Sequence, residues 1–334
     1  MKIQQNRSLL PLNTFGMDET AAYFANISSI DDLVEAADLP LKKFILGGGS
    51  NILITAPVNG LVLHNCLKGI DVINEDDNYT FLKVQSGEVW HGLVLYAIDK
   101  GLGGIENLAL IPGTVGAAPI QNIGAYGVEV KDVIESVTYF DWKKNTLITL
   151  QAFACNFGYR DSIFKHELKD KGFITSVVFR LSKKPAYNTG YGAIEVELKN
   201  MEVNQLSVKA IANAVINIRT SKLPDPKKIG NAGSFFKNPT IPISLLERLQ
   251  ILYPNIPHYP VNESMVKIPA GWLIEQCGWK GYKDNNIGVH ALQALVLVNY
   301  GGASGKSIYD LSQKIIKSVQ DKFGIGLESE VGIW

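Results

Sequence analysis

The sequence predicts a fold of mixed α and β structure with more than one domain, and three observations predict it. Strand-like and helix-like runs of apolar residues follow one another along the whole chain. Two glycine-rich loops, at 47–51 and 111–127, each come directly after an apolar segment. A stretch rich in proline and glycine, 219–239, marks a boundary between the predicted helices on either side of it. With 334 residues, the chain can hold two or three domains.

The first glycine-rich loop, GGGSN, lies between predicted strands at Lys43–Leu46 and Ile52–Ile54. A flexible linker in solvent is not embedded between apolar strands in this way. A further strand is predicted at Tyr79–Gln85, after which Ser86 occupies the N-cap position of a helix that Gly101 ends. The apolar positions of this helix are Val89, Trp90, Leu93, Val94 and Ala97.

The second loop, IPGTVGAAPIQNIGAYG at 111–127, contains four glycines, two prolines and no charged residue. Glycine lets main-chain N–H groups approach a bound group closely, and proline stiffens the path of the chain. Apolar connections of this length are uncommon in compact domains unless they are functional. Two such loops predict a binding site for one large, phosphate-bearing cofactor.

Strands and then helices are predicted beyond the second loop. The predicted strands between 133 and 181 are Val137–Phe140, Leu147–Thr149 and Ile174–Leu181. The remaining predicted elements are a helix at Val208–Ile218, a helix that carries Trp272, Leu273 and Gln276, a strand at Ala294–Val298, a helix from Ile308 to Phe323 that ends before Gly324, and a strand-like C-terminal tail.

Two other glycine-containing segments fail the tests for nucleotide-binding motifs. GLGGIE has Glu106 where the pattern GxGxxG requires a glycine. GGASGKS has Tyr300 where a P-loop requires its first glycine, so we expect a strand-to-helix turn with Ser304 or Ser307 as the N-cap.

Composition limits the partners and the location of the protein. Thirty-two basic and thirty-two acidic residues cancel, and no basic run occurs, which argues against nucleic acid or an anionic membrane as the main partner. The N-terminal segment lacks the apolar core of a signal peptide, and no run approaches the roughly 18 apolar residues of a membrane span. We therefore expect a cytoplasmic protein. The three cysteines and five histidines lack disulfide-framework or metal-ligand spacing, so core thiols and no metal site are expected.

Three short polar clusters stand out as candidates for chemistry. They are FGYRDSIFK at 157–165, NAGSFFKNP at 231–239 and LESEV at 327–331. Each also has a structural interpretation. Arg160 and Asp161 could form an ion pair, Ser234 could be a turn or N-cap residue, and Glu330 could be a solvated charge on an edge strand.

These segments resemble the UDP-N-acetylenolpyruvoylglucosamine reductase family. GGGSN, the 111–127 loop, FGYRDSIFK, KLPDPKKIGNAGSFFKNP, AGWLIEQCG, QALVL and LESEV occur in that family's order, from Leu12 to Glu330. The resemblance implies an α+β fold, with a two-lobed FAD-binding domain of the vanillyl-alcohol-oxidase/PCMH-like type and a smaller α/β substrate-binding domain. The implied boundaries are 1–66 and 67–220 for the two FAD-binding lobes, with the strand 325–334 joining the second, and 221–324 for the substrate-binding domain.

The resemblance also implies the reaction and its cofactors. A noncovalently bound FAD would pass hydride from NADPH to UDP-N-acetylglucosamine enolpyruvate, yielding UDP-N-acetylmuramate. The implied FAD-binding residues are Gly47, Gly48, Gly49, Ser50, Asn51, Pro112, Gly113, Gly116, Asn122, Gly124 and Arg219. The chain has no second dinucleotide-binding fold, so one site is expected to serve NADPH and the UDP-sugar in turn. A monomer is expected.

The same resemblance assigns roles to the polar clusters. Hydride addition pushes negative charge onto the substrate carboxylate, and Arg160 is the cation that can bind it bidentately. By resemblance, Glu330 polarises the substrate and Ser234 delivers a proton, although a hydroxyl is poorly matched to acid catalysis at neutral pH. The implied ligands of the UDP diphosphate are Tyr191, Lys222, Asn238 and Gln293, with Tyr191 on a loop that closes over the substrate. The family pattern is broken at Ser329, where proline is expected.

Two alternatives remain open at this point. A flavin oxidase of the same broad fold would act on an alcohol, and many such enzymes attach flavin through His or Cys, which neither glycine-rich loop contains. A nucleotide-sugar sensor on the same scaffold would not need the combination of Arg160, Ser234 and Glu330.

Overall fold

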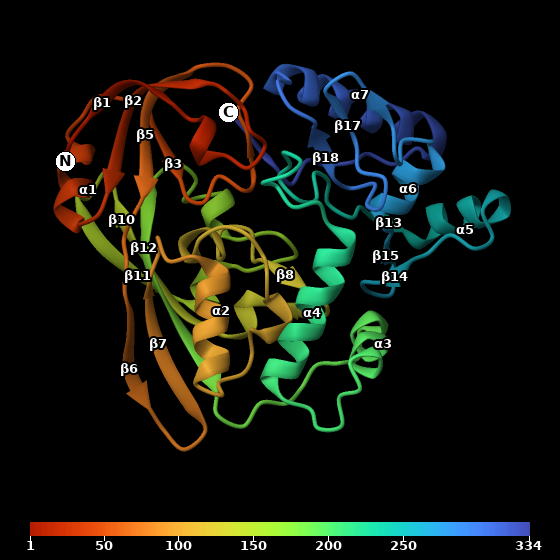
Figure 1. Ribbon diagram of the computed structural model, residues 1–334, viewed down its shortest axis with the longest axis horizontal. Coiled ribbons are helices and arrows are strands. Elements are labelled where there is room, and N and C mark those ends of the chain that lie inside the picture. The colour runs from red at the N-terminus through yellow and green to blue at the C-terminus, as the bar shows by residue number, and fades with distance from the viewer. The chain divides into compact units, whose positions relative to one another are not determined.

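Figure 1 shows the computed structural model of the whole chain, residues 1–334, whose elements divide between two units. Unit 1 comprises Met1–Arg7, Ala21–Gly48 and Asn59–Ser221, and unit 2 comprises Ser8–Thr20, Gly49–Val58 and Lys222–Trp334. The first glycine-rich loop thus contributes two residues to unit 1 and three to unit 2. None of the helices combines the length and apolar character needed to cross a membrane.

Unit 1 contains a four-stranded sheet in the order β1-β2-β5-β3. Its strands are β1 (Gln4–Ser8), β2 (Thr20–Ile27), β5 (Val58–Asn65) and β3 (Lys43–Leu46), with β3 parallel to β5. The end residues Ser8, Thr20 and Val58 belong to unit 2. The predicted strand at Lys43–Leu46 is therefore confirmed. The helix α1 (Ile30–Ala37) begins at a capping box formed by Ser29 and Asp32, and it buries Leu33 and Ala36.

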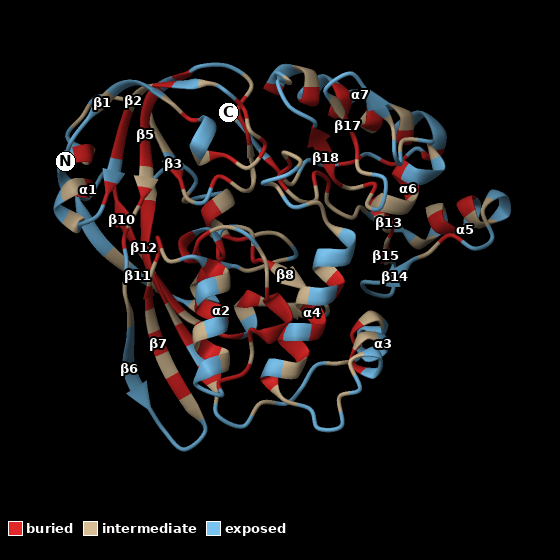
Figure 2. Ribbon diagram, viewed as in Figure 1, coloured by how far each residue is buried: buried red, intermediate tan, exposed pale blue.

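The larger sheet of unit 1 has five antiparallel strands in the order β11-β10-β12-β7-β6. They are β11 (Thr146–Gln151), β10 (Ile134–Asp141), β12 (Gly172–Ser182), β7 (Tyr79–Gln85) and β6 (Ile70–Glu75). All four strands predicted in this sheet are confirmed within these bounds. The edge strand β6 is mostly exposed, whereas β10 and β12 are mostly buried (Figure 2).

Helices and short elements complete unit 1. The helices are α2 (Trp90–Asp99), α3 (Gly192–Asn200) and α4 (Val208–Lys222), whose last residue belongs to unit 2, and the short hairpin pairs β8 (Gly124–Ala125) with β9 (Val128–Glu129). Trp90 of α2 packs edge-on against Phe179 of β12, with ring centroids 5.9 Å apart. Single 3₁₀ turns occur at η2 (Glu106–Leu108), η3 (Val115–Ala117), η4 (Val130–Asp132), η5 (Ala152–Cys155) and η6 (Ile163–Lys165).

The predicted N-cap at Ser86 is wrong. The helix begins at Trp90 after Val89, and Ser86 is buried, where its hydroxyl accepts a hydrogen bond from Asn65 Nδ2 at 2.8 Å. The physical reason is that residues 86–90 pair with the second glycine-rich loop before the helix starts. The predicted helix at Val208–Ile218 is confirmed but continues to Lys222, so Arg219 is helical.

Unit 2 consists of short strands and three helices. Its strands are β4 (Ile52–Leu53) with β19 (Gly332–Ile333), then β13 (Thr240–Pro242), β15 (Met265–Lys267) and β14 (Tyr259–Pro260), and finally β16 (Lys283–Asp284), β17 (Ile287–Val289) and β18 (Leu297–Asn299). The helices are α5 (Ile243–Leu252), α6 (Ala270–Gln276) and α7 (Gly305–Phe323), and a 3₁₀ turn, η1, spans Leu10–Leu12. The C-terminal strand pairs in parallel with the strand that follows GGGSN.

Most predictions in unit 2 are confirmed. Ser304 caps α7 by accepting from the Ser307 amide, and Gly324 ends it in a left-handed conformation, φ +68°. The strand predicted at Ala294–Val298 begins only at Leu297. The preceding residues form a turn closed by Val296 N donating to the Gln293 carbonyl at 3.0 Å, which apolar composition alone does not reveal.

Candidate active site

The two glycine-rich loops lie against each other in unit 1. A Cβ on Gly48 would stand 3.0 Å from the Gly113 Cα, and one on Gly47 would stand 2.6 Å from the Thr114 hydroxyl oxygen. Glycine is required at both positions because the two backbones approach closely. The sequence placed the loops on separate strand ends, and the structure brings them together.

The second loop is fixed to the segment that leads into α2. Val115 N donates to the Glu88 carbonyl and Gly116 N donates to the Ser86 carbonyl, both at 2.8 Å. Trp90 N donates to the Gly113 carbonyl at 3.0 Å. These main-chain bonds hold the loop in one shape although it contains little regular structure.

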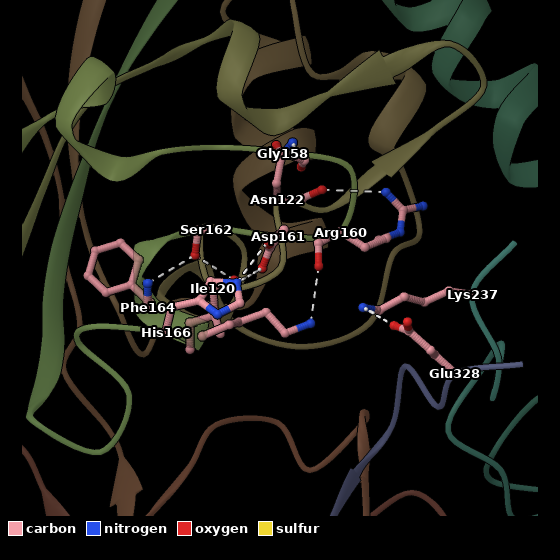
Figure 3. A network of polar contacts seen from close by, with 11 residues as sticks. Ile120, Asn122, Gly158, Arg160, Asp161, Ser162, Phe164, His166, Lys237 and Glu328 are labelled. Carbon is pink, nitrogen blue, oxygen red and sulfur yellow. Dashed lines mark hydrogen bonds and ion pairs between the residues drawn. The ribbon is translucent and has the colours of Figure 1, made fainter. Parts of the chain in front are cut away.

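The FGYRDS segment is attached to the same loop (Figure 3). The buried Asn122 donates from Nδ2 to the Gly158 carbonyl at 2.8 Å and to Glu129 at 3.2 Å, and its Oδ1 accepts from the Lys131 amide. Ser162 donates its hydroxyl proton to the Ile120 carbonyl at 2.6 Å. The side chain of Asn122 is therefore engaged within the protein, and its predicted cofactor contact stays a prediction.

Arg160 lies on a turn that the segment presents beside the loop. Its backbone is left-handed, φ +54°, and its guanidinium donates to the carbonyls of Gly124 and Asn122. The guanidinium carbon lies 5.3 Å from the centroid of the Tyr159 ring. A Cβ on Gly124 would stand 2.9 Å from Arg160 Nη1, so this glycine makes room for the guanidinium.

Asp161 pairs with a histidine of the same segment. His166 Nε2 lies 2.8 and 2.9 Å from the two carboxylate oxygens of Asp161. Burial alone would raise the pKa of Asp161, but the hydrogen bond and charge of His166, aided by the Ser162 amide, lower it overall. The structure thus pairs the Asp161 carboxylate with the His166 ring.

Arg219 forms a second cationic feature of unit 1, within α4. Its Nε is buried and has no hydrogen-bond partner, and its guanidinium is hydrogen-bonded to Tyr126. Burial lowers the pKa of Arg219, and Tyr126 acts in the opposite direction. Burial also lowers the pKa of the nearby His91, with a smaller contribution from the charge of Arg219. An orphaned buried N–H is rare and here suits a ligand acceptor.

Tyr191 packs against Tyr126, the hydrogen-bond partner of Arg219. Its ring meets the Tyr126 ring edge-on, with centroids 5.3 Å apart and an interplanar angle of 89°. Burial raises the pKa of Tyr126, and the charge of Arg219 opposes that shift. Tyr126 and His91 are site residues that the sequence reasoning missed. Tyr126 lies inside the loop that the sequence singled out, but nothing local marks its left-handed backbone, φ +50°.

Unit 2 brings four segments together that are far apart in the sequence. Thr14 N donates to the Gly49 carbonyl at 3.1 Å, and the Thr14 hydroxyl donates to the Asn231 carbonyl at 2.7 Å. Asn51 Nδ2 donates to the Glu330 carbonyl at 3.1 Å. Gly49 is left-handed, φ +61°, and a Cβ there would stand 1.9 Å from the Leu12 carbonyl oxygen, so only glycine fits. Ser50 lies between these two loop residues.

A main-chain hydrogen bond joins the segments that carry Ser234 and Glu330. Glu330 N donates at 2.8 Å to the carbonyl of Phe235, the residue that follows Ser234 in the chain. Lys237 N donates to the Glu328 carbonyl at 3.0 Å, and the two side chains form an ion pair at 3.2 Å (Figure 3). Both Ser234 and Glu330 are half-buried. Two of the three predicted catalytic residues therefore share one pair of extended segments, while Arg160 belongs to unit 1.

Two predicted diphosphate ligands lie at the first turn of α6. Asn238 Oδ1 accepts from the Ala270 amide at 2.9 Å, and Gln293 Oε1 would be 3.5 Å from a Cβ on Gly271. Lys222 is exposed at the end of α4. Pro112 is exposed beside Gly113 in the second loop.

Comparison with known proteins identifies both parts of the chain. Residues 225–334 match the family model described as the UDP-N-acetylenolpyruvoylglucosamine reductase C-terminal domain, and residues 21–151 match that of an FAD binding domain. The chain is 48% identical to the UDP-N-acetylenolpyruvoylglucosamine reductase of Flavobacterium johnsoniae, with 100% of both chains covered. It is 50% identical to that of Amoebophilus asiaticus, with 100% of this chain and 99% of the relative covered.

Solved structures confirm the predicted fold class. The crystal structure of UDP-N-acetylenolpyruvylglucosamine reductase from Thermus caldophilus matches with a TM-score of 0.72 and 23% identity, over 100% of this chain and 99% of that one. A solvent-stable cholesterol oxidase matches with a TM-score of 0.50 and 11% identity, over 95% and 85%. These likenesses concern the fold: an FAD-binding domain of the vanillyl-alcohol-oxidase/PCMH-like type plus a second, smaller domain.

Proposed function

The chain belongs to the family of UDP-N-acetylenolpyruvoylglucosamine reductases, and we propose how its residues divide the work of that reaction. The enzyme reduces UDP-N-acetylglucosamine enolpyruvate to UDP-N-acetylmuramate in peptidoglycan precursor synthesis, with FAD as cofactor and NADPH as reductant. Bound FAD supplies the hydride chemistry between NADPH and the substrate alkene.

The contact between the glycine-rich loops at Gly48 and Gly113 is the observation that carries the FAD assignment. Side chains are excluded there, so main-chain N–H groups can approach a diphosphate. The buried, unpartnered Nε of Arg219 offers one further donor of the kind that a flavin oxygen or phosphate accepts. Gly47, Gly48, Gly113, Gly116 and Arg219 hold the cofactor in unit 1, and the remaining predicted contacts come from the other loop residues.

Arg160 binds the substrate carboxylate. When hydride adds to the terminal alkene carbon, electron density moves toward that carboxylate and the substrate becomes enolate-like. A guanidinium bound to a carboxylate by two N–H groups stabilises this charge more than the ground state, which lowers the barrier. The carbonyls of Gly124 and Asn122 orient the guanidinium before substrate arrives.

Ser234 completes the reduction by giving its hydroxyl proton to the carbon alpha to the carboxylate. A serine can do this because the carbanion-like carbon is strongly basic. Glu330 polarises the substrate, and its position is set by the bond from its amide to the Phe235 carbonyl. Tyr191, Lys222, Asn238 and Gln293 bind the UDP diphosphate.

The domain roles follow the same division. We assign FAD binding to 1–66 and 67–220, with the strand 325–334 joining the second lobe, and substrate binding to 221–324. The enzyme acts as a cytoplasmic monomer on small ligands and has no nucleic-acid or membrane partner, in keeping with its balanced charge.

Spectroscopy and kinetics test the assignment. The purified protein should be yellow, NADPH should bleach it under nitrogen, and the enolpyruvyl substrate should restore the colour with release of UDP-N-acetylmuramate. If one site serves both ligands in turn, initial rates should give parallel double-reciprocal lines. Intersecting lines, or a complex with NADP⁺ and the UDP-sugar bound together, would contradict a shared site.

A further inference from the structure

Asn107 is a buried amide of unit 1 that has no role in the steps above. It lies in η2 and is 2% exposed. Its side-chain nitrogen donates to the Tyr126 carbonyl at 3.2 Å and to the Asn188 carbonyl at 2.9 Å. An amide NH₂ has two hydrogens, and here each meets a main-chain carbonyl from a different loop. One side chain therefore joins the end of the second glycine-rich loop to the segment that leads to Tyr191.

A second bond joins the same two segments. Asn188 Nδ2 donates to the Gly127 carbonyl at 3.2 Å, and Gly127 is left-handed, φ +80°. Three residues after Asn188, the Tyr191 ring packs edge-on against the Tyr126 ring. Asn107 thus bonds to the main chain of Tyr126 itself and to the main chain three residues before Tyr191.

We propose that Asn107 is a positioning residue that holds Tyr191 ready to receive the substrate diphosphate. The proposal rests on the proposed role of Tyr191. A segment that is free in solution loses conformational freedom when it binds a ligand, and that loss weakens binding. The Asn107 bonds stabilise this arrangement of the segment relative to other arrangements, so less conformational freedom is lost when the loop closes over the substrate.

Replacing Asn107 with leucine tests this because leucine keeps the approximate size and removes both donors. The dissociation constant of the oxidised holoenzyme for UDP-N-acetylglucosamine enolpyruvate should rise about three- to thirtyfold. Flavin reduction at saturating NADPH should be unchanged. Asn188→Ala removes the second link at an exposed position, and it should shift the dissociation constant in the same direction by a smaller factor.

Two further measurements separate positioning from general destabilisation. Hydrogen exchange of the amides at 188–191 should be faster in Asn107→Leu without substrate, and unchanged exchange would overturn the proposal. In a Tyr191→Phe background, Asn107→Leu should weaken binding little further because both variants remove the same contact. Independent, multiplying effects would also overturn it.

The Tyr191→Phe variant also separates this proposal from the function on which it rests. If Tyr191→Phe weakens binding and Asn107→Leu does not, only the positioning role fails. If Tyr191→Phe leaves binding unchanged, the diphosphate assignment of Tyr191 fails, and the role of Asn107 fails with it.

Discussion

The segment around Arg160 in unit 1 and the segments around Ser234 and Glu330 in unit 2 differ in backbone shape and in the bonds next to their site residues. In unit 1, Asn122, Tyr126 and Arg160 all have left-handed backbones, with φ of +43°, +50° and +54°. Side chains that donate to main-chain carbonyls stabilise these shapes, as Asn122, Arg160 and Asn107 do. In unit 2, main-chain bonds join the extended segments around Ser234 and Glu330.

This difference predicts which substitutions disturb the local backbone and which affect only the reaction. A left-handed conformation costs a non-glycine residue of the order of 1 kcal/mol, so unit 1 depends on the particular side chains that offset that cost. In unit 2 the backbones that carry Ser234 and Glu330 are extended, and neither the Ser234 hydroxyl nor the Glu330 carboxylate takes part in the main-chain bonds that join them. Replacing the Ser234 side chain should therefore change the reaction alone, whereas substitutions around Arg160 should also move their neighbours.

The largest effect is expected from Ser234→Ala in unit 2. Reoxidation of the reduced enzyme by the enolpyruvyl substrate should fall by roughly 10²- to 10⁴-fold, because the proton donor is lost. Flavin reduction by NADPH and the free energy of unfolding should stay nearly unchanged. Stopped-flow absorbance of each half-reaction measures this. Ser264→Ala, in the turn before β15, is the control, and equal slowing of both halves would limit Ser234 to shaping the site.

Gly124→Ala in unit 1 should slow the reaction by displacing a neighbouring side chain, unlike Ser234→Ala. The new Cβ would stand 2.9 Å from both Arg160 Nη1 and the Val128 carbonyl oxygen, so the guanidinium must move. A displacement of this size can cost about a hundredfold in rate, here in reoxidation by substrate. Gly92→Ala, at an exposed position of α2 where the nearest atom would be 3.8 Å away, should have no such effect. A normal rate for Gly124→Ala would show that unit 1 tolerates rearrangement.

Tyr191→Phe removes one hydroxyl and retains the ring contact with Tyr126. A hydrogen bond to a charged group contributes roughly 1.5–3 kcal/mol, so the dissociation constant of the UDP-sugar should rise about ten- to a hundredfold. The rate at saturating substrate should change less. Tyr187→Phe, on the same segment, is the matched control for titrations followed by flavin absorbance. Loss of rate without loss of binding would show that Tyr191 is not a diphosphate ligand.

Local patterns in the sequence predicted the elements well and their contacts poorly. Gly324 and Ser304 mark the ends of α7 because glycine and serine act within one turn of the chain. The Ser86 N-cap prediction failed because Ser86 bonds to Asn65 and Thr175. Both partners are distant in the sequence, so a local pattern does not reveal these bonds.

The candidate site shows the same limit. Family resemblance named Arg160, Ser234 and Glu330, which lie in recognisable motifs. Tyr126 and Asn107 carry no such signal, because their importance comes from nonlocal partners: Arg219 for one and Asn188 for the other.

The smallest effect is expected from Asp161→Asn, which tests whether side chains hold the Arg160 turn at all. The folded-state pKa of Asp161 is lowered, so its carboxylate contributes stability above its unfolded pKa, about 4, and that contribution is lost as pH falls through the folded value. Both partners of the His166 pair are well exposed, 62% and 41%, so solvent screening limits the contribution to at most about 1 kcal/mol.

Urea unfolding of both proteins should therefore show Asp161→Asn less stable from pH 7 to about pH 4.5, with the difference shrinking below pH 4. The turn also contains a main-chain bond from Gly158 N to the Asp161 carbonyl at 3.0 Å, which the substitution retains. If neither stability nor substrate binding changes at any pH, that main-chain bond is sufficient. The contrast between the two regions would then rest on the side-chain bonds of Asn122, Arg160 and Asn107, without Asp161.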